Sequence, residues 1–313
     1  MRVLFWGTPE FAATSLRALI GEGFEVAGVV TQPDKPQGRS RKLVGPPVKQ
    51  IALEEKITCF QPTNPRDAEF NEMLAVMQPD ISVVAAYGHI MPKRIIDLPR
   101  LGTINVHASL LPALRGAAPI QAAIRRGLSE TGISIMRMVP ALDAGPVILQ
   151  GAAQILDDET YGELKLRLSE LGALTLVEAL ALISLGAARE TPQEESLMSL
   201  APKITRDDAR IDWALSAVEV SRTIRAYDPK PGAFTTHNGV DVKMFGPKIV
   251  GSEARDTLHP GQVVSAEGGV TVACGTGAIR VADVQPSGRR RMSAAAWSRG
   301  RGIAAGDVLG SRD

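Results

Sequence analysis

Short apolar runs alternate with stretches of helical periodicity over the first part of the chain. The apolar runs at residues 3–6, 25–31, 58–61, 81–86 and 103–106 predict buried strands, and residues 47–55, 66–77 and 117–126 predict helices. Thr8 and Pro9 predict the start of a further helix that ends near Gly21, with Thr8 as its N-cap. This alternation is typical of an α/β domain with a Rossmann-like, mostly parallel sheet covered on both faces.

The pattern changes after Gly132, where strands are expected in hairpins rather than between helices. Residues 133–138 and 147–155 predict a hairpin, 161–185 predict a long amphipathic helix, and 216–226 predict a shorter one. The C-terminal part holds short β segments separated by glycine turns, of which Asn238-Gly239 is the clearest hairpin signal. Short strands with frequent turns favour a small OB-like β-barrel.

A polar stretch that contains prolines separates the two patterns. It covers residues 187–210 and is typical of a linker. We therefore expect one domain at 1–188, a linker at 189–208 and a second domain at 209–313.

Composition excludes several classes of protein. The 313 residues are 44% hydrophobic and 22% charged, and 35 basic against 34 acidic side chains leave a net charge of +1, as in ordinary globular proteins. No apolar run reaches the roughly 20 residues of a membrane span, and the first residues lack the apolar stretch of a signal peptide. Two distant cysteines and four scattered histidines match neither a disulfide framework nor a metal site. We expect a cytoplasmic monomer that needs no metal and no obligate protein partner.

Basic side chains gather at two places. Residues 35–49 hold five of them and no acidic side chain, and residues 284–313 hold six arginines against two aspartates. Such clusters on a nearly neutral chain indicate a polyanionic partner, although solvated loops carry similar charges. The first cluster lies between a predicted strand and helix and is rich in Gly and Pro. We expect it to be a long loop that becomes ordered only against a partner.

Asn105 and His107 are the strongest candidates for chemistry. They stand two residues apart at the end of a predicted strand, so both side chains point to one face. Ligands of open parallel sheets bind at that end of the strands. A carboxamide and an imidazole can both donate a hydrogen bond to a carbonyl oxygen that becomes negative. Because a histidine at a strand end is often structural, the pair alone does not decide the matter.

Two turns bear on the same site. Asp143 lies between two predicted strands. It either caps its own turn or, if the sheet brings it to His107, orients the imidazole or keeps it cationic. The turn at residues 7–10 follows a strand, where dinucleotide phosphates often bind. It lacks the Gly-x-Gly-x-x-Gly pattern and contains a proline without an amide hydrogen, so it disfavours a nicotinamide cofactor.

Several blocks of the sequence resemble the folate-dependent formyltransferases. The blocks lie at residues 105–107, 109–112, 115–121 and 143–145. Further matches at 7–11, 31–34, 201–204, 211–213, 231–234 and 288–292 extend the resemblance over nearly the whole chain. Together they are most similar to the members that act on methionyl-tRNA. The Asn-x-His and Asp-x-Gly motifs are specific for the superfamily, whereas the 115–121 block, the basic loop and the C-terminal module indicate the tRNA branch.

The resemblance implies a folate-binding catalytic domain at 1–188 and an OB-like tRNA-binding barrel at 209–313. It implies formyl transfer from 10-formyltetrahydrofolate to the amino group of methionyl initiator tRNA, for translation initiation. Asn105, His107 and Asp143 match the catalytic positions. The folate-binding positions are Tyr87, Gly88, His89, Ile90, Ser109, Leu110, Leu111 and Pro112. The tRNA-binding positions are Lys35, Arg39, Arg41, Lys42, Lys203, Arg289, Arg290 and Arg291.

The mechanism we expect is direct acyl transfer. Asn105 and a protonated His107 stabilise the tetrahedral oxygen, while Asp143 favours the protonated imidazole. The chain departs from the family pattern at His89, Arg137, Pro140 and Lys230, and two of these departures flank the turn that carries Asp143.

Other interpretations stay open. A formyltransferase acting on a sugar-nucleotide or glycinamide ribonucleotide amine would share the same three residues, and the basic 35–45 loop carries most of the distinction. A hydrolase of formyl-folate would share them too. A non-catalytic RNA-binding module would not need them.

Overall fold

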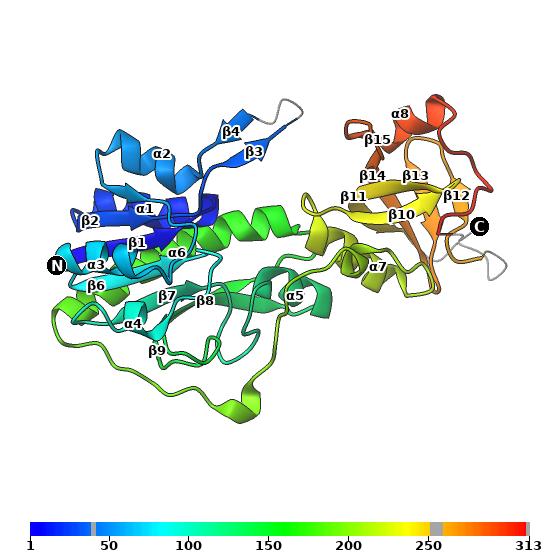
Figure 1. Cartoon of the computed structure of the whole chain (residues 1–313). Helices are drawn as coiled ribbons and strands as arrows, with labels where there is room; N and C mark the ends of the chain where they lie inside the picture. Colours follow the sequence, from blue (N-terminus) through cyan, green and yellow to red (C-terminus); the bar gives the residue numbers. More distant parts are fainter. Residues whose placement is uncertain (39–41, 251–258, 311–313) are drawn as a thin grey trace. The chain divides into compact units, whose positions relative to one another are not determined.

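The computed structural model describes residues 1–38, 42–250 and 259–310, and its contacts divide the chain into two units (Figure 1). The first unit comprises Met1–Pro119, Glu130–Gln154 and Lys165–Ala201, and the second comprises Ile120–Ser129, Ile155–Leu164 and Pro202–Asp313. Within the described ranges, no helix has the length and apolar character needed to cross a membrane.

A seven-stranded sheet of described residues forms the centre of the first unit (Figure 1). Its strands are β1 (Arg2–Gly7), β2 (Glu25–Val30), β5 (Cys59–Phe60), β6 (Ile81–Ala85), β7 (Thr103–His107), β8 (Glu130–Arg137) and β9 (Val147–Gln154). The strand order is β5-β2-β1-β6-β7-β8-β9, with parallel pairing from β5 to β7 and antiparallel pairing from β7 to β9. The carboxyl ends of the parallel strands therefore share one edge.

Helices cover both faces of this sheet. They are α1 (Glu10–Gly21), α2 (Pro47–Glu54), α3 (Ala68–Val76), α4 (Lys93–Ile96) and most of α6 (Tyr161–Ser184). Apart from Pro119, helix α5 (Pro119–Arg126) belongs to the second unit, as do the first residues of α6. On one face Trp6 of β1 packs in a buried cluster with Phe70 of α3 and Ile95 of α4. On the other, Gly172 of α6 lies against Val106 of β7. Because side chains alternate along a strand, the neighbours of Val106 in β7 point to the α3 and α4 face.

The first helix begins one residue later than the sequence predicts. It starts at Glu10, and Pro9 occupies the N-cap position with no side-chain bond, so the predicted capping by Thr8 is wrong. The Thr8 hydroxyl instead donates to the Tyr87 carbonyl at 3.0 Å and lies 3.4 Å from the Gln32 amide. Thr8 thus ties the ends of β1, β2 and β6 together at the edge where ligands bind in such sheets.

A curled antiparallel sheet forms the second unit (Figure 1, yellow to red). Its strands are β10 (Ala233–His237), β11 (Val240–Val250), β12 (Val263–Ser265), β13 (Val270–Ala273), β14 (Ala278–Pro286) and β15 (Met292–Ser293). Helices α7 (Ala217–Tyr227) and α8 (Ala294–Arg299) contact it. Of two short 3-10 helices, η2 (Asp207–Ala209) belongs to this unit and η1 (Glu195–Leu197) to the first. A capping box between Ser216 and Glu219 fixes the start of α7. This is the OB-like module that the turn pattern predicts.

The basic loop has more regular structure than the sequence predicts. Strands β3 (Lys35–Gln37) and β4 (Lys42–Val44) form a two-stranded antiparallel ladder. The expectation that this segment lacks structure without a partner is therefore wrong for its two described arms. Arg39 and Arg41 lie outside the described residues.

Candidate active site

Asn105 and His107 lie at the carboxyl end of β7, in the interior of the sheet. β7 pairs with β6 on one side and with β8 on the other. Asn105 is half-buried, and its carboxamide makes no hydrogen bond within the part of the chain that the structure describes. The carboxamide is therefore available to a ligand at this edge.

His107 and Asp143 come together from different strands. His107 is only 5% exposed, and its Nδ1 lies 3.7 Å from Asp143 Oδ2, beyond normal hydrogen-bond distance. Each group has a backbone partner instead: His107 Nε2 lies 3.1 Å from the Leu114 carbonyl oxygen, and the Gly116 amide donates to Asp143 Oδ2 at 2.8 Å. Because a carbonyl oxygen can only accept, Nε2 carries the proton. A neutral His107 then leaves Nδ1 bare and facing Asp143.

Burial decides the charge of His107. It lowers the pKa of His107 below the ordinary value of 6.5, although the Asp143 charge and the bond to the Leu114 carbonyl both act to raise it. Burial thus favours the neutral imidazole before the reaction, while the protonated His107 expected from the sequence concerns the tetrahedral intermediate and stays a prediction. The resting site has a proton acceptor at Nδ1 instead of an imidazolium.

Ser134, which no motif in the sequence marks, holds the loop after β7. Its fully buried hydroxyl donates to the Ser109 carbonyl at 2.7 Å and accepts from the Leu111 amide at 2.9 Å. Gln150 on β9 donates to the Leu111 carbonyl at 3.0 Å. The Ser109 hydroxyl bonds within its own loop, to the Ala113 carbonyl at 2.6 Å. Of the predicted folate-binding residues, Ser109 and Leu111 are thus buried in the loop that follows β7.

The turn that carries Asp143 has a tightly defined backbone. Asp143 has a φ of +47°, in the left-handed region that aspartate adopts more readily than most residues. A Cβ at Gly145 would stand 1.8 Å from the Arg137 carbonyl oxygen, so only glycine fits there. The Arg137 side chain, one of the departures from the family pattern, pairs with Glu190 at 2.7 Å. The Arg137 backbone thus borders this turn, while its guanidinium is bound to Glu190.

Residues 193–201, here called the strap, lie against the loop after β7. The sequence predicts a linker at this position. In the structure the Arg115 amide donates to the Ser199 carbonyl at 2.8 Å, and the Ala201 amide donates to the Arg115 carbonyl at 2.7 Å. The Leu114 amide donates to the Ser199 hydroxyl at 3.0 Å. The strap therefore pairs directly with the backbone that contacts His107 and its partner.

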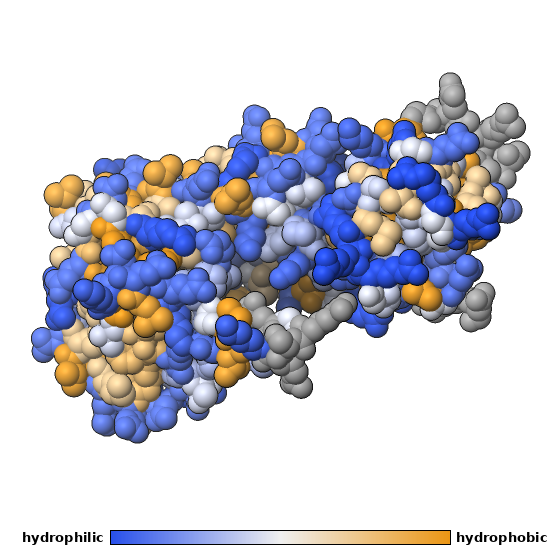
Figure 2. Space-filling model, turned by 90° about the horizontal axis from the view of Figure 1, so that it is seen from above, coloured by the Kyte–Doolittle hydropathy of each residue, from blue (hydrophilic) through white to orange (hydrophobic). Residues whose placement is uncertain are grey.

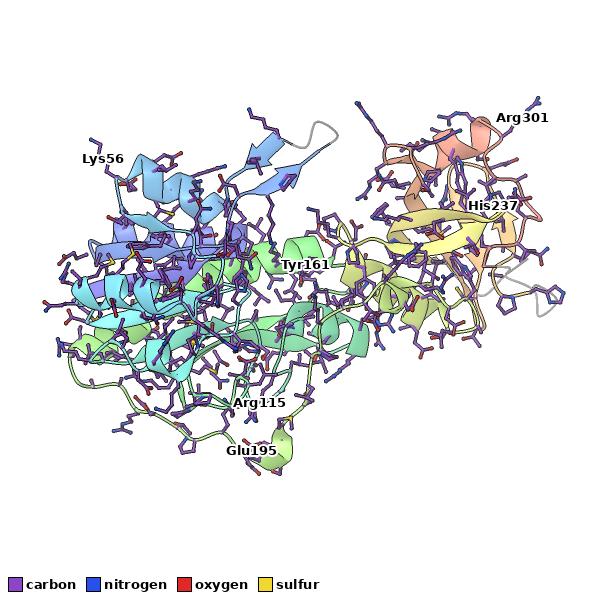
Figure 3. All side chains as sticks on the ribbon, in the orientation of Figure 1. Lys56, Arg115, Tyr161, Glu195, His237 and Arg301 are labelled. Atoms are coloured by element: carbon purple, nitrogen blue, oxygen red, sulfur yellow. The ribbon has the colours of Figure 1, made fainter. Side chains whose placement is uncertain are left out.

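Side chains add to this pairing. Gln193 Nε2 donates to the carbonyl oxygens of Asp143 and Gly145, at 2.8 and 2.7 Å. Gln193 Oε1 accepts from Arg115 Nε at 2.9 Å. The Arg115 guanidinium also donates to both carboxylate oxygens of Glu195, and the two side chains face each other in Figure 3. Nothing in the local sequence around Gln193 marks it as part of the site.

The loop after β6 carries the remaining predicted folate positions. The Tyr87 ring is 2% exposed and packs edge-on against Trp6, with centroids 5.2 Å apart, so its side chain belongs to the core. Gly88, His89 and Ile90 are exposed, Ile90 to 81%. Since β6 and β7 are parallel neighbours, this loop and the end of β7 lie at the same edge of the sheet.

The predicted tRNA-binding positions differ in their surroundings. Those marked by exposed side chains are Lys35, Lys42, Lys203, Arg289, Arg290 and Arg291. Figure 2 shows strongly hydrophilic residues over much of the visible surface of the second unit, to which the last four belong. Among the described residues, no group of histidine, cysteine or acidic side chains could hold a metal ion.

Arg291 stands apart from its two neighbours. Its guanidinium pairs with Asp228 at 3.1 Å and with Asp283 at 2.9 Å, and it lies 4.1 Å from the centre of the Phe245 ring. These contacts join the end of α7 to strands β11 and β14 of the second unit. Much of the Arg291 charge is therefore already balanced within the protein.

Comparison with known proteins supplies the family. Residues 1–180 match the formyl transferase model, and residues 203–302 match the model of the formyl transferase C-terminal domain. The methionyl-tRNA formyltransferase of Methylococcus capsulatus is 44% identical over 294 residues, which cover 94% of this chain and 95% of that protein. The one of Moorella thermoacetica is 43% identical over 311 residues, which cover 99% of each chain. The chain belongs to the methionyl-tRNA formyltransferase family.

Solved structures share the fold. HypX from Aquifex aeolicus in complex with tetrahydrofolic acid has a TM-score of 0.69 and 18% identity, over 95% of this chain and 46% of HypX. An N-formyltransferase from Helicobacter canadensis, with folinic acid and dTDP-3-aminofucose, has a TM-score of 0.68 and 14% identity, over 93% and 99% of the two chains. The fold class and the formyltransferase activity that the sequence predicts are confirmed by the family.

Proposed function

We propose that the chain transfers the formyl group of 10-formyltetrahydrofolate to the amino group of methionyl initiator tRNA, in the cytoplasm, for translation initiation. The observation that carries this proposal is the Asn105 carboxamide, without a hydrogen bond among the described residues, beside a His107 whose bare Nδ1 faces Asp143. The set suits a reaction in which a carbonyl oxygen gains negative charge while an amine loses a proton. The names of the relatives support the tRNA acceptor, and the HypX complex supports the folate donor.

In this reaction one proton moves from the methionyl nitrogen to the folate nitrogen, and His107 can hold it in between. The methionyl nitrogen attacks the formyl carbon, and the Asn105 amide donates to the oxygen as its negative charge develops. The attacking nitrogen gives its proton to Nδ1 of His107, and the imidazolium is stabilised by the Asp143 charge. The same proton then passes to the folate nitrogen as its bond to the formyl carbon breaks. His107 returns to its neutral state, so atoms and charge balance.

The test measures formyl transfer to charged methionyl initiator tRNA. Uncharged tRNA, glycinamide ribonucleotide and a sugar-nucleotide amine serve as competing acceptors. Asn105→Ala should lower turnover by about 10²–10³-fold, because one donor to the developing oxyanion is lost, while folate binding changes much less. Asn64→Ala, at an exposed turn, is the matched control. Turnover of Asn105→Ala within a few-fold of the parent, or preference for a small amine, would contradict the proposal.

The basic β3–β4 hairpin tests the tRNA acceptor separately. If Lys42 neutralises a tRNA phosphate, Lys42→Gln should weaken tRNA binding and reduce the slope of log affinity against log salt by about one. Lys56→Gln removes an equal charge from an exposed position near the end of α2, labelled in Figure 3, and should leave the slope unchanged. The same measurement applies to Arg39, which the sequence favours as the main contact. Equal slopes for all variants would leave the hairpin without a role in tRNA binding.

A further inference from the structure

The two titratable partners of the candidate site depend on one short piece of backbone. His107 is oriented by the carbonyl of Leu114, and Asp143 is oriented by the amide of Gly116. The direct approach of the two side chains, at 3.7 Å, is too long to fix either of them. Whatever holds residues 114–116 in place therefore sets the geometry of both.

The strap holds that backbone. It pairs with Arg115 on both its amide and its carbonyl, through Ser199 and Ala201. The approach is so close at Gly116 that a Cβ there would stand 2.5 Å from the Ala201 carbonyl oxygen, and the residue has a φ of +124°. The backbone on either side of the Gly116 amide consequently has little freedom to move away from Asp143.

Gln193 joins this loop to the turn that carries Asp143. Both hydrogens of its amide are used on carbonyl oxygens of that turn, and its oxygen accepts from Arg115. Arg115 is only 5% exposed, and the side chains that its guanidinium contacts, Gln193 and Glu195, both belong to the strap. A buried guanidinium needs such partners, because leaving it unpaired is costly. The Gln193 side chain thus connects the loop after β7 to the turn that carries Asp143, and the reaction requires these two segments to keep their relative position.

We infer that Gln193 is a positioning residue for formyl transfer, acting with Arg115 to hold Asp143 at its distance from His107. Gln193 has no hydrogen bond to His107 among the described residues, and it acts through the Asp143 turn. The kinetic part of this inference rests on the proposed function. The geometric part does not, because the separation of His107 and Asp143 can be followed without any substrate.

Gln193→Met is the variant that tests the inference, since it keeps the length of the side chain and removes its hydrogen bonds. We expect kcat for formyl transfer to fall by about 10- to 100-fold, because misplacing a reacting group by about 1 Å costs up to 10²-fold. KM for each substrate should stay within about twofold, since uniform binding is unchanged. Glu194→Gln is the matched control: it changes the neighbouring strap residue, whose carboxylate bonds only to Ser196 among the described residues.

An NMR titration of His107 in the substrate-free protein gives the second readout. Displacement of the Asp143 carboxylate removes an effect that raises the pKa of His107, so this pKa should fall in Gln193→Met and stay at the parent value in Glu194→Gln. If the unsubstituted protein does not transfer a formyl group, the proposed function is refuted, and the His107 titration still tests whether Gln193 positions Asp143. A folded Gln193→Met with parental kcat and an unchanged His107 titration would overturn the inference.

A second variant covers the case in which Gln193→Met does not fold. Glu195 is 67% exposed on its side chain, so Glu195→Ala leaves the core untouched and removes only one partner of Arg115. We expect the same two changes in smaller degree. If Glu195→Ala changes neither kcat nor the His107 titration, the strap does not position Asp143 and the inference fails.

Discussion

The described part of the chain contains two histidine–aspartate pairs, one joined by a direct hydrogen bond and one not. In the second unit, His237 Nε2 lies 3.0 Å from Asp307 Oδ2, and the same oxygen accepts from the Ala304 amide. The His237 ring also packs edge-on against Trp297, with centroids 5.7 Å apart. This pair is bonded directly and joins strand β10 to the segment after α8.

The pair in the first unit is open. His107 and Asp143 each bond to backbone, and 3.7 Å separates their facing atoms. Both histidines are nearly buried, His107 at 5% and His237 at 9% exposed, so burial does not distinguish the pairs. In this chain the open pair leaves Nδ1 of His107 able to accept a proton, whereas in the other pair Nε2 of His237 is already in a hydrogen bond with Asp307. His237 is correspondingly assigned a structural role.

The largest effect is expected from replacing the histidines one at a time. His107→Asn should lower formyl transfer by about 10²–10⁴-fold, the usual contribution of a positioned acid or base. His237→Asn should leave turnover within a few-fold. Each variant loses a hydrogen bond worth about 1 kcal/mol of unfolding free energy. Urea unfolding and kinetics on both variants check this, and a comparable loss of turnover in His237→Asn would break the comparison.

Replacing the aspartates should have a smaller effect. Asp143→Asn removes the charge that raises the pKa of His107, and each unit of pKa lost makes Nδ1 tenfold less basic, so we expect turnover to fall about tenfold. Asp307→Asn is the control in the other pair and should not change turnover. The titration of His107 by NMR accompanies the assay. A pKa of His107 that stays constant or rises in Asp143→Asn would show that the open pair is not coupled.

The smallest effect concerns the dependence of stability on pH. Burial holds the pKa of His107 in the folded protein below 6.5, its ordinary value in an unfolded chain. At a pH between the folded and the unfolded pKa, the unfolded chain therefore binds more protons than the folded one. Stability therefore rises with pH in this window: the His107 contribution is complete above about pH 6.5 and is lost as the pH falls towards the folded pKa. The parent should lose more stability than His107→Asn between about pH 7.5 and about pH 5.5. Equal losses in urea unfolding would contradict this.

Much of the first unit follows from local sequence, because its apolar strands are short, buried on both faces and separated by helices. Asn105 and His107 could be singled out because their spacing and their place at a strand end are both local facts. The sequence predicts the wrong role for Thr8, because its position suits an N-cap while its hydroxyl bonds to residues that follow two other strands. Strands β3 and β4 have three residues each, which is too short for an alternation of polar and apolar residues to predict a strand.

The supporting residues could not be predicted for a different reason. Ser134 and Gln193 are ordinary polar residues in their own segments, and each is important only through groups that the fold brings from elsewhere. Ser134 requires the pairing of β7 with β8, and Gln193 requires a stretch of linker composition to turn back onto the sheet. The charge of His107 likewise depends on burial, which the residues beside it in sequence do not reveal.

The strap also bears on how such enzymes can evolve. A gene fusion that exchanged the C-terminal module at the end of α6 would replace residues 193–201 along with it, and with them the partners of Arg115. Only a crossover after Ala201 would transplant the module and leave the recipient's reaction geometry intact. The position at which recombination can occur therefore lies in the last part of the polar stretch at residues 187–210, after Ala201, and not at its start. Where enzymes of this fold changed their amine substrate by exchanging the C-terminal module, we expect the strap to have stayed with the unit that carries His107 and Asp143.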